Sequence, residues 1–311
     1  MQLSDVFTSV PLTNVSLAYK PVGYISEMLA PLVKVKKDAG KIYSYGMDNL
    51  RIVPTYRSVG GKPQIVTTEV SSATHYSLDD HVIGEYIAEE IIENADSPLK
   101  PRTDTTEAIT DRLWLDKEKA LADVVTDTSV MTQYTTLTGT DQWSDYTNSD
   151  PIDDINTGID AVRSGSGKMP NTLVLAYNTM RKLTYHPAIK DMYPGAVKIT
   201  NAMLEDGLKS IFGFENVLVG KAQYNNSNKG GTDTLTDIWS KVAIVCYVEK
   251  TPTLKSRTLA NTYHTKAPRR VQVMTQGSGS LELMQRKSDY LQVSDKYDQV
   301  LVDVTCAYLI D

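Results

Sequence analysis

The stretch from Leu173 to Gly195 holds the residues whose types and spacing come closest to a catalytic arrangement. It reads LVLAYNTMRKLTYHPAIKDMYPG and gathers His186, Lys190 and Tyr193 in one turn region. A histidine there could move protons, but nucleophilic catalysis also needs a Ser or Cys and an acid that orients the ring. No nucleophile motif lies near His186, and Asp191 is its nearest acid. Because helix ends present unpaired backbone groups that an imidazole can bind, we predict a structural role for His186.

Other residues that could bind a metal or a phosphate lack the required spacing. His75 and His81 lie six positions apart, and this is a weak pattern for a zinc or iron site. The run RSGSGKMP resembles a phosphate-binding loop, but Val162 and Met169 occupy the positions that need Gly and Ser or Thr. We therefore predict a chain that is not an enzyme and that holds no metal or cofactor.

Composition limits the classes of function further. The chain has 311 residues, 41% of them hydrophobic, and a formal net charge of -6. Its length allows a substantial core and one or two domains, and its charge argues against a broad basic face for nucleic acid. Cys246 and Cys306 each lie in an apolar run, which excludes a disulfide framework. We expect no membrane span, since no apolar run approaches the roughly 18 residues required, and no secretory signal.

The residues around His186 belong to a predicted α/β module over residues 150–245. Asp150 and Pro151 are typical of an N-cap and a first helical position, followed by a helix with one apolar face. A strand over 172–177, a helix capped by Asn178, a short helix at 187 and a helix over 200–212 ending at Gly213 follow. Strands over 215–223 and 239–250 complete the module, with a polar loop between them.

A long amphipathic helix precedes this module. Asp104 and Glu107 have the spacing of a capping box, and apolar residues recur at helical intervals, so we predict a helix over about 104–127. Its opposite side carries charged residues that we interpret as a solvated face: Asp111, Asp116, Lys119 and Asp123.

The first 80 residues divide into two predicted segments. Residues 1–34 are interrupted by Pro11, Pro21 and Pro31, which predicts an extended arm that lies on another surface. Residues 35–80 are rich in Tyr, Val, Ile and Thr, which predicts a long, largely polar hairpin with its tip at Val59, Gly60, Gly61 and Lys62. A lone two-stranded ribbon is marginally stable in water, so we expect another surface to hold it, although an ordinary edge hairpin remains an alternative.

This order of parts resembles the major capsid proteins of tailed double-stranded DNA bacteriophages, which have the Hong Kong 97 type fold. The run ENADSPLKPRTDTTEAITDRLWLDKEKALADVVTD is similar to the segment that forms their spine helix, and LVLAYNTMRKLTYHPAIKD is similar to a strand and helix of their axial domain. The resemblance implies an α+β fold with an N-terminal arm (1–34), an extended hairpin or E-loop (35–80), a peripheral domain (81–149 and 246–311) and an axial domain (150–245).

The resemblance also implies function, partners and location. We expect a structural coat protein that self-assembles through hexamers and pentamers into an icosahedral head enclosing double-stranded DNA. Its partners would be further copies of itself, a separate scaffolding protein, a portal and a decoration protein, with weak non-specific contact to packaged DNA and none to membrane. The location would be the virion, with assembly in the bacterial cytoplasm. Lys62 would be the residue for a crosslink between subunits, if one forms.

Two basic clusters are candidates for contacts between subunits or with phosphate. They are KVKK, with Lys34, Lys36 and Lys37, and KAPRR, with Arg269 and Arg270.

Two alternatives stay open from the sequence. An encapsulin-like nanocompartment would share the fold and enclose a cargo enzyme, and a soluble α/β enzyme would use the module over residues 150–250.

Overall fold

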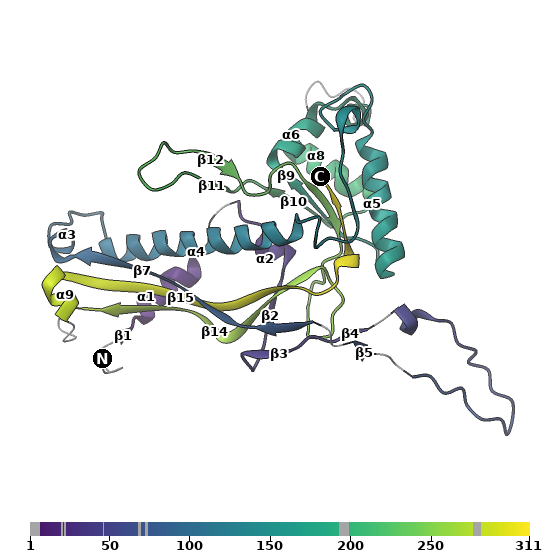
Figure 1. Cartoon of the computed structure of the whole chain (residues 1–311), viewed down its shortest axis with the longest axis horizontal. Helices are drawn as coiled ribbons and strands as arrows, with labels where there is room; N and C mark the ends of the chain where they lie inside the picture. The colour runs from purple at the N-terminus through teal and green to yellow at the C-terminus, as the bar shows by residue number, and fades with distance from the viewer. Residues whose placement is uncertain are drawn as a thin grey trace.

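The computed structural model describes residues 7–19, 21, 23–45, 47–67, 70–71, 74–192, 199–275 and 281–311. Tyr193, named above with His186, lies outside them. The chain forms two five-stranded sheets and several short hairpins, with one long helix beside the first sheet and an α/β module at one end (Figure 1). In the described parts of the chain, no helix combines the length and the apolar character that crossing a membrane requires.

Long antiparallel strands build the first sheet. Its order is β1-β14-β15-β7, with β2 parallel to β14. These strands are β1 (Phe7–Thr8), β2 (Leu32–Lys34), β7 (Asp79–Ala88), β14 (Ala260–Met274) and β15 (Ser288–Leu301). The short helices α3 (Glu89–Glu93) and α9 (Leu281–Arg286) lie at its far end (Figure 1).

The predicted long helix is α4 (Pro101–Val125), which packs along β15 and β7. The prediction of a capping box at Asp104 is wrong, because the helix begins earlier. Pro101 occupies its first turn, and the N-cap, Lys100, makes no side-chain hydrogen bond to the helix. Proline suits this position, since the first helical amides lack partners in any case. Ile109, Leu113 and Leu121 are buried as their spacing predicts.

The N-terminal segment differs from the extended arm that its prolines suggested. Residues 10–18 form helix α1 (Val10–Ala18), with Pro11 in its first turn and Ser9 accepting a hydrogen bond from the Leu12 amide. Helix α2 (Ser26–Leu29) follows. The Ser16 and Thr110 hydroxyls lie 2.8 Å apart in a buried contact between α1 and α4. The described part of this segment therefore packs on its own chain.

The second sheet has the order β10-β9-β13-β16-β8. Its strands are β8 (Tyr134–Thr135), β9 (Thr172–Ala176), β10 (Asn216–Gly220), β13 (Ala243–Cys246) and β16 (Ala307–Ile310). Successive residues of β9 enter different cores: Leu173 and Leu175 pack with the module helices, whereas Val174 and Ala176 pack with the end of α4. Because both faces are covered, the strands are continuously apolar. The last strand, β16, joins this sheet, although the sequence assigned residues 246–311 to the other domain.

The module helices are α5 (Pro151–Ser166), α6 (Tyr177–Tyr185), α7 (Pro187–Lys190) and α8 (Asn201–Phe212). The cap at Asp150 is confirmed, since its carboxylate accepts from two amides of the first turn of α5. Gly213 ends α8 in the left-handed conformation with φ 74°, as predicted. Asn178 is not a cap: it lies inside α6, and its amide donates to Asp237 over 2.6 Å.

The polar segment predicted as a loop before β13 contains a hairpin. Strands β11 (Gln223–Asn225) and β12 (Leu235–Asp237) pair antiparallel. The hairpin projects from the module on the side of α4 (Figure 1). The Lys119 ammonium lies 5.3 Å from the centre of the Tyr224 ring at its base.

Candidate assembly surface

The segment predicted as a long hairpin is paired only at its base. Strands β3 (Ala39–Lys41) and β6 (His75–Ser77) form one short ladder, and β4 (Ser44–Tyr45) and β5 (Val70–Ser71) form the next. A 3-10 turn at Met47–Leu50 follows, and no strand occurs in the described residues 51–67. The segment extends away from the body of the molecule (Figure 1). The prediction of long paired arms is therefore wrong. The ladder ends where the apolar support of the body ends.

The predicted tip is a tight turn. The Gly61 amide donates to the Ser58 carbonyl over 2.9 Å, and Gly60 has φ 79°. This positive φ at the third residue matches a type II turn, which favours glycine there. The turn presents the Val59 side chain fully to solvent.

Exposed apolar side chains follow the whole outer part of this segment, residues 50–66, which we call the extended loop. Six of them have relative exposures between 63% and 106%: Leu50, Ile52, Tyr56, Val59, Ile65 and Val66. Contiguous apolar surface outside a folded body is typical of a binding surface, because its burial against a partner is favourable.

The base of the extended loop is fixed to the body. Tyr76 stacks on Tyr263 of β14 with ring centres 4.9 Å apart, and both side chains are buried. Ile42 packs in the same core, and the Lys296 ammonium lies 2.8 Å from Asp38. A rigid base and an unsupported outer part let the loop reach a neighbour from a defined origin.

The two basic clusters differ in their accessibility. Lys34, Lys36 and Lys37 are exposed. Arg270 is exposed as well, but Arg269 is buried and pairs with Asp295 over 2.9 Å. Alternation along β14 explains the difference, since neighbouring residues of a strand face opposite sides. The prediction of phosphate contact for Arg269 is wrong, because its guanidinium is committed inside the chain.

A buried carboxylate joins three segments that are distant in the sequence. Glu118 of α4 accepts hydrogen bonds from the Ile25 amide (3.0 Å), the Ser26 amide (2.7 Å) and the Trp239 indole (2.7 Å). Its neighbour Lys117 lies 3.2 Å from Glu27. The residue is fully buried, so these donors are its only partners in the described part of the chain. Sequence analysis missed this junction, which ties α2 and the segment between β12 and β13 to α4.

His186, the histidine considered for catalysis, has structural partners. His186 is buried, its Nδ1 accepts from the Ala188 amide over 3.2 Å, and its Nε2 lies 3.0 Å from the Ser149 hydroxyl. Burial lowers the pKa of His186 below its usual value. The predicted structural role is confirmed, although the ring caps the next helix instead of binding free carbonyls. Among the described residues, no group of three or more His, Cys, Asp or Glu is arranged to hold a metal.

The chain is similar in sequence to two phage capsid proteins. No family model matches it. A major capsid protein of Burkholderia phage BcepMu is 28% identical over 239 residues, which cover 76% of this chain and 75% of that protein. A major capsid protein of Pseudomonas phage JBD67 is 28% identical over 242 residues, covering 77% and 76%.

Solved structures have the same fold. A phage-related protein from Bordetella bronchiseptica has a TM-score of 0.76 at 22% identity, covering 98% of this chain and 96% of that one. The mature capsid of bacteriophage PhiM1 gives 0.56 at 10% identity, covering 94% and 88%. A virus-like particle from Pyrococcus furiosus gives 0.53 at 11% identity, covering 96% of each chain. The chain therefore has the mixed α+β Hong Kong 97 type capsid fold, and the enzyme alternative is wrong.

Proposed function

We propose that this chain, a structural coat protein and a homologue of phage major capsid proteins, assembles through hexamers and pentamers into an icosahedral head that encloses double-stranded DNA. The observation that carries the proposal is the extended loop. Its apolar side chains have no core of their own to enter, so their burial requires another copy. Both curated relatives are phage proteins, which favours a phage head over an encapsulin-like cargo compartment.

Each domain has its own role in the proposed assembly. Residues 35–80 act as the E-loop that reaches a neighbouring subunit, with Val59, Gly60, Gly61 and Lys62 at the tip of the contact. Residues 81–149 and 246–311 form the peripheral domain along the spine helix, except for strands β8 and β16, which join the sheet of the axial domain (residues 150–245). Residues 1–34 form the N-terminal arm. Repetition of modest contacts around a closed shell makes the whole stable.

The proposed setting follows from the same function. The chain resides in the virion, after synthesis and assembly in the bacterial cytoplasm. Its further partners are a scaffolding protein, a portal and a decoration protein. The exposed cations Lys34, Lys36, Lys37 and Arg270 make weak contacts with packaged DNA or with neighbouring subunits. The net charge of -6 supports weak contact, since a strongly attractive wall would oppose the movement of DNA during packaging.

Deletion of residues 59–62 tests the role of the extended loop. We expect the variant subunit to fold and to lose most of its shell yield, because the deletion removes the apolar tip, whose hydrogen bond from Gly61 to Ser58 lies within the turn itself. Shell yield is measured by sedimentation and electron microscopy, and folding by circular dichroism.

A second turn of the chain supplies a matched control. In the β11–β12 hairpin the Gly231 amide donates to the Asn228 carbonyl over 2.9 Å, and Gly230 has φ 89°. Deletion of residues 228–231 therefore removes four residues from a similar exposed turn that carries no apolar side chain. A normal shell yield after deletion of 59–62, or an equal loss in both variants, would refute the assigned role.

A further inference from the structure

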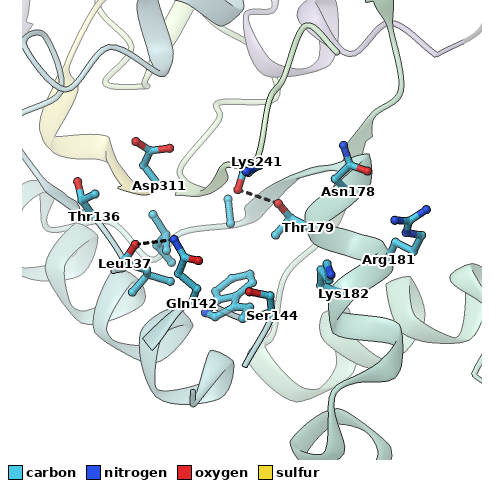
Figure 2. Close-up of a pocket in the computed structure, with 13 residues that line it drawn as sticks. Thr136, Leu137, Gln142, Ser144, Asn178, Thr179, Arg181, Lys182, Lys241 and Asp311 are labelled. Atoms are coloured by element: carbon cyan, nitrogen blue, oxygen red, sulfur yellow. Dashed lines mark hydrogen bonds between the residues drawn. The ribbon is translucent and has the colours of Figure 1, made fainter. Parts of the chain in front are cut away.

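A cavity of about 520 Å³ opens at one end of the second sheet. Its walls come from separate parts of the chain: the segment after β8, the first turns of α6, the start of β13 and the end of β16 (Figure 2). Two hydrogen bonds hold α6 against the end of β12 and the segment that follows it. The Thr179 hydroxyl donates to the Lys241 carbonyl over 2.8 Å, and Asn178 donates to Asp237 over 2.6 Å.

Three cations line this cavity without a partner. Arg181 and Lys182 come from α6, and Lys241 comes from the segment before β13. All three are exposed, and within the described chain their side chains make no hydrogen bond or ion pair. Asp311 is the single acidic residue of the lining. The excess of positive charge in one concave site is unusual for a chain whose net charge is -6.

The remaining lining combines neutral polar side chains with an apolar part. Trp143 is only 5% exposed, and its indole donates to Asp154 over 2.7 Å, which fixes the orientation of the ring. Leu137, Ala243 and Ile310 contribute further apolar surface. A cavity of this size and composition, with a few polar groups at defined places, has the character of a ligand site.

We propose that this cavity binds an acidic peptide segment of a partner protein, with an aliphatic side chain against Trp143 and carboxylates at Arg181, Lys182 and Lys241. Charge complementarity favours an acidic ligand, and the apolar lining favours a peptide over a nucleic acid. A polynucleotide is bound through cations placed along its backbone, whereas these cations line one cavity that also contains Asp311. The proposal is independent of self-assembly.

Fluorescence anisotropy with the full chain tests the site. The probe is a labelled pentapeptide of sequence EELEE, and the comparison peptide is QQLQQ. We expect EELEE to bind more tightly, with an affinity that falls as salt rises. Removing two cations together, Arg181→Gln and Lys182→Gln, should weaken binding by roughly three- to tenfold, since each exposed ion pair contributes modestly. Lys229→Gln is the control, because Lys229 is an equally exposed cation in the β11–β12 hairpin.

Four results would overturn the proposal. Equal affinity for QQLQQ removes the role of the carboxylates. An equal effect of Lys229→Gln removes the role of the cavity. Equal or tighter binding of a single-stranded oligonucleotide of the same charge assigns the cations to nucleic acid. Sedimentation of the Arg181→Gln, Lys182→Gln variant distinguishes a partner protein from another copy of this chain. Loss of shells would assign the cavity to another copy, whereas an unchanged shell yield is expected for a partner protein.

Discussion

The buried carboxylate of Glu118 allows a quantitative test of how the two sheets are joined. Substitution Glu118→Gln keeps the size and shape of the side chain but replaces one acceptor oxygen by an amide donor. In the native chain, Oε1 faces the Trp239 indole and Oε2 faces the Ser26 amide, each at 2.7 Å. Either orientation of glutamine therefore places its NH₂ group against another N–H donor. The substitution leaves one buried donor without a partner and weakens the bonds that remain.

The expected cost follows from these contacts. An orphaned buried donor costs about 1–3 kcal/mol, and a hydrogen bond to a charged group contributes about 1.5–3 kcal/mol against about 1 kcal/mol for a neutral one. We expect Glu118→Gln to lower the free energy of unfolding by about 3–5 kcal/mol. Urea unfolding of the dispersed subunit, followed by tryptophan fluorescence, measures this difference.

A matched substitution on the same helix provides the control. Glu107→Gln changes the same atoms at a half-buried position where no hydrogen bond of the side chain is observed, so we expect a change within about 0.5 kcal/mol. A cost below about 1 kcal/mol for Glu118→Gln would refute the idea that this carboxylate fastens α2 and Trp239 to α4.

Two further predictions concern other buried polar groups. His186→Asn keeps an acceptor for the Ala188 amide but removes the titrating ring. Burial lowers the pKa of His186, so the folded protein resists protonation of the ring. Its contribution to stability is complete above pH 6.5 and falls as the pH decreases toward the lowered pKa. Thermal unfolding between about pH 7 and pH 5 should show a weaker pH dependence for the variant, and an identical dependence would contradict this account. Arg269→Met leaves Asp295 buried without its partner and should cost about 3–5 kcal/mol in urea unfolding. Adding Asp295→Leu should recover most of that loss, and a double variant as unstable as the single one would contradict the pairing.

Local signals predicted the α/β module well. The cap at Asp150, the left-handed Gly213 and the apolar strand β9 each depend on a few consecutive residues. Such signals are complete within the segment that they describe, so a sequence displays them directly. The turn at Gly60 was predictable for the same reason.

Prolines gave a wrong prediction for the N-terminal segment. Pro11 was interpreted as a break, yet it lies in the first turn of α1, where a missing amide hydrogen costs nothing. The start of α4 was predicted too late for another reason: the spacing of Asp104 and Glu107 was interpreted as a capping box, whereas Pro101 lies in the first turn. A proline therefore marks a boundary without showing on which side the helix lies.

The junction at Glu118 depends on partners far along the chain. The Ile25 amide and the Trp239 indole are 93 and 121 positions away, and no local pattern connects them. One signal was available: Lys117 and Glu118 share the helical face of Trp114 and Leu121, where charged residues are rarely buried unless they are paired.

The final strand shows why the order of elements along the chain predicts the fold but does not predict the limits of the domains. Strand β16 pairs with β13 in the second sheet, although β14 and β15 of the first sheet separate them in sequence. The chain thus leaves the module after β13 and returns to it, and the end of α4 enters the same core. Two crossings and a shared core join the two sheets, so we expect adaptation to different neighbours to occur mainly outside them. Among the described segments, the extended loop has the least internal support, and variation in packing between subunits should therefore concentrate there.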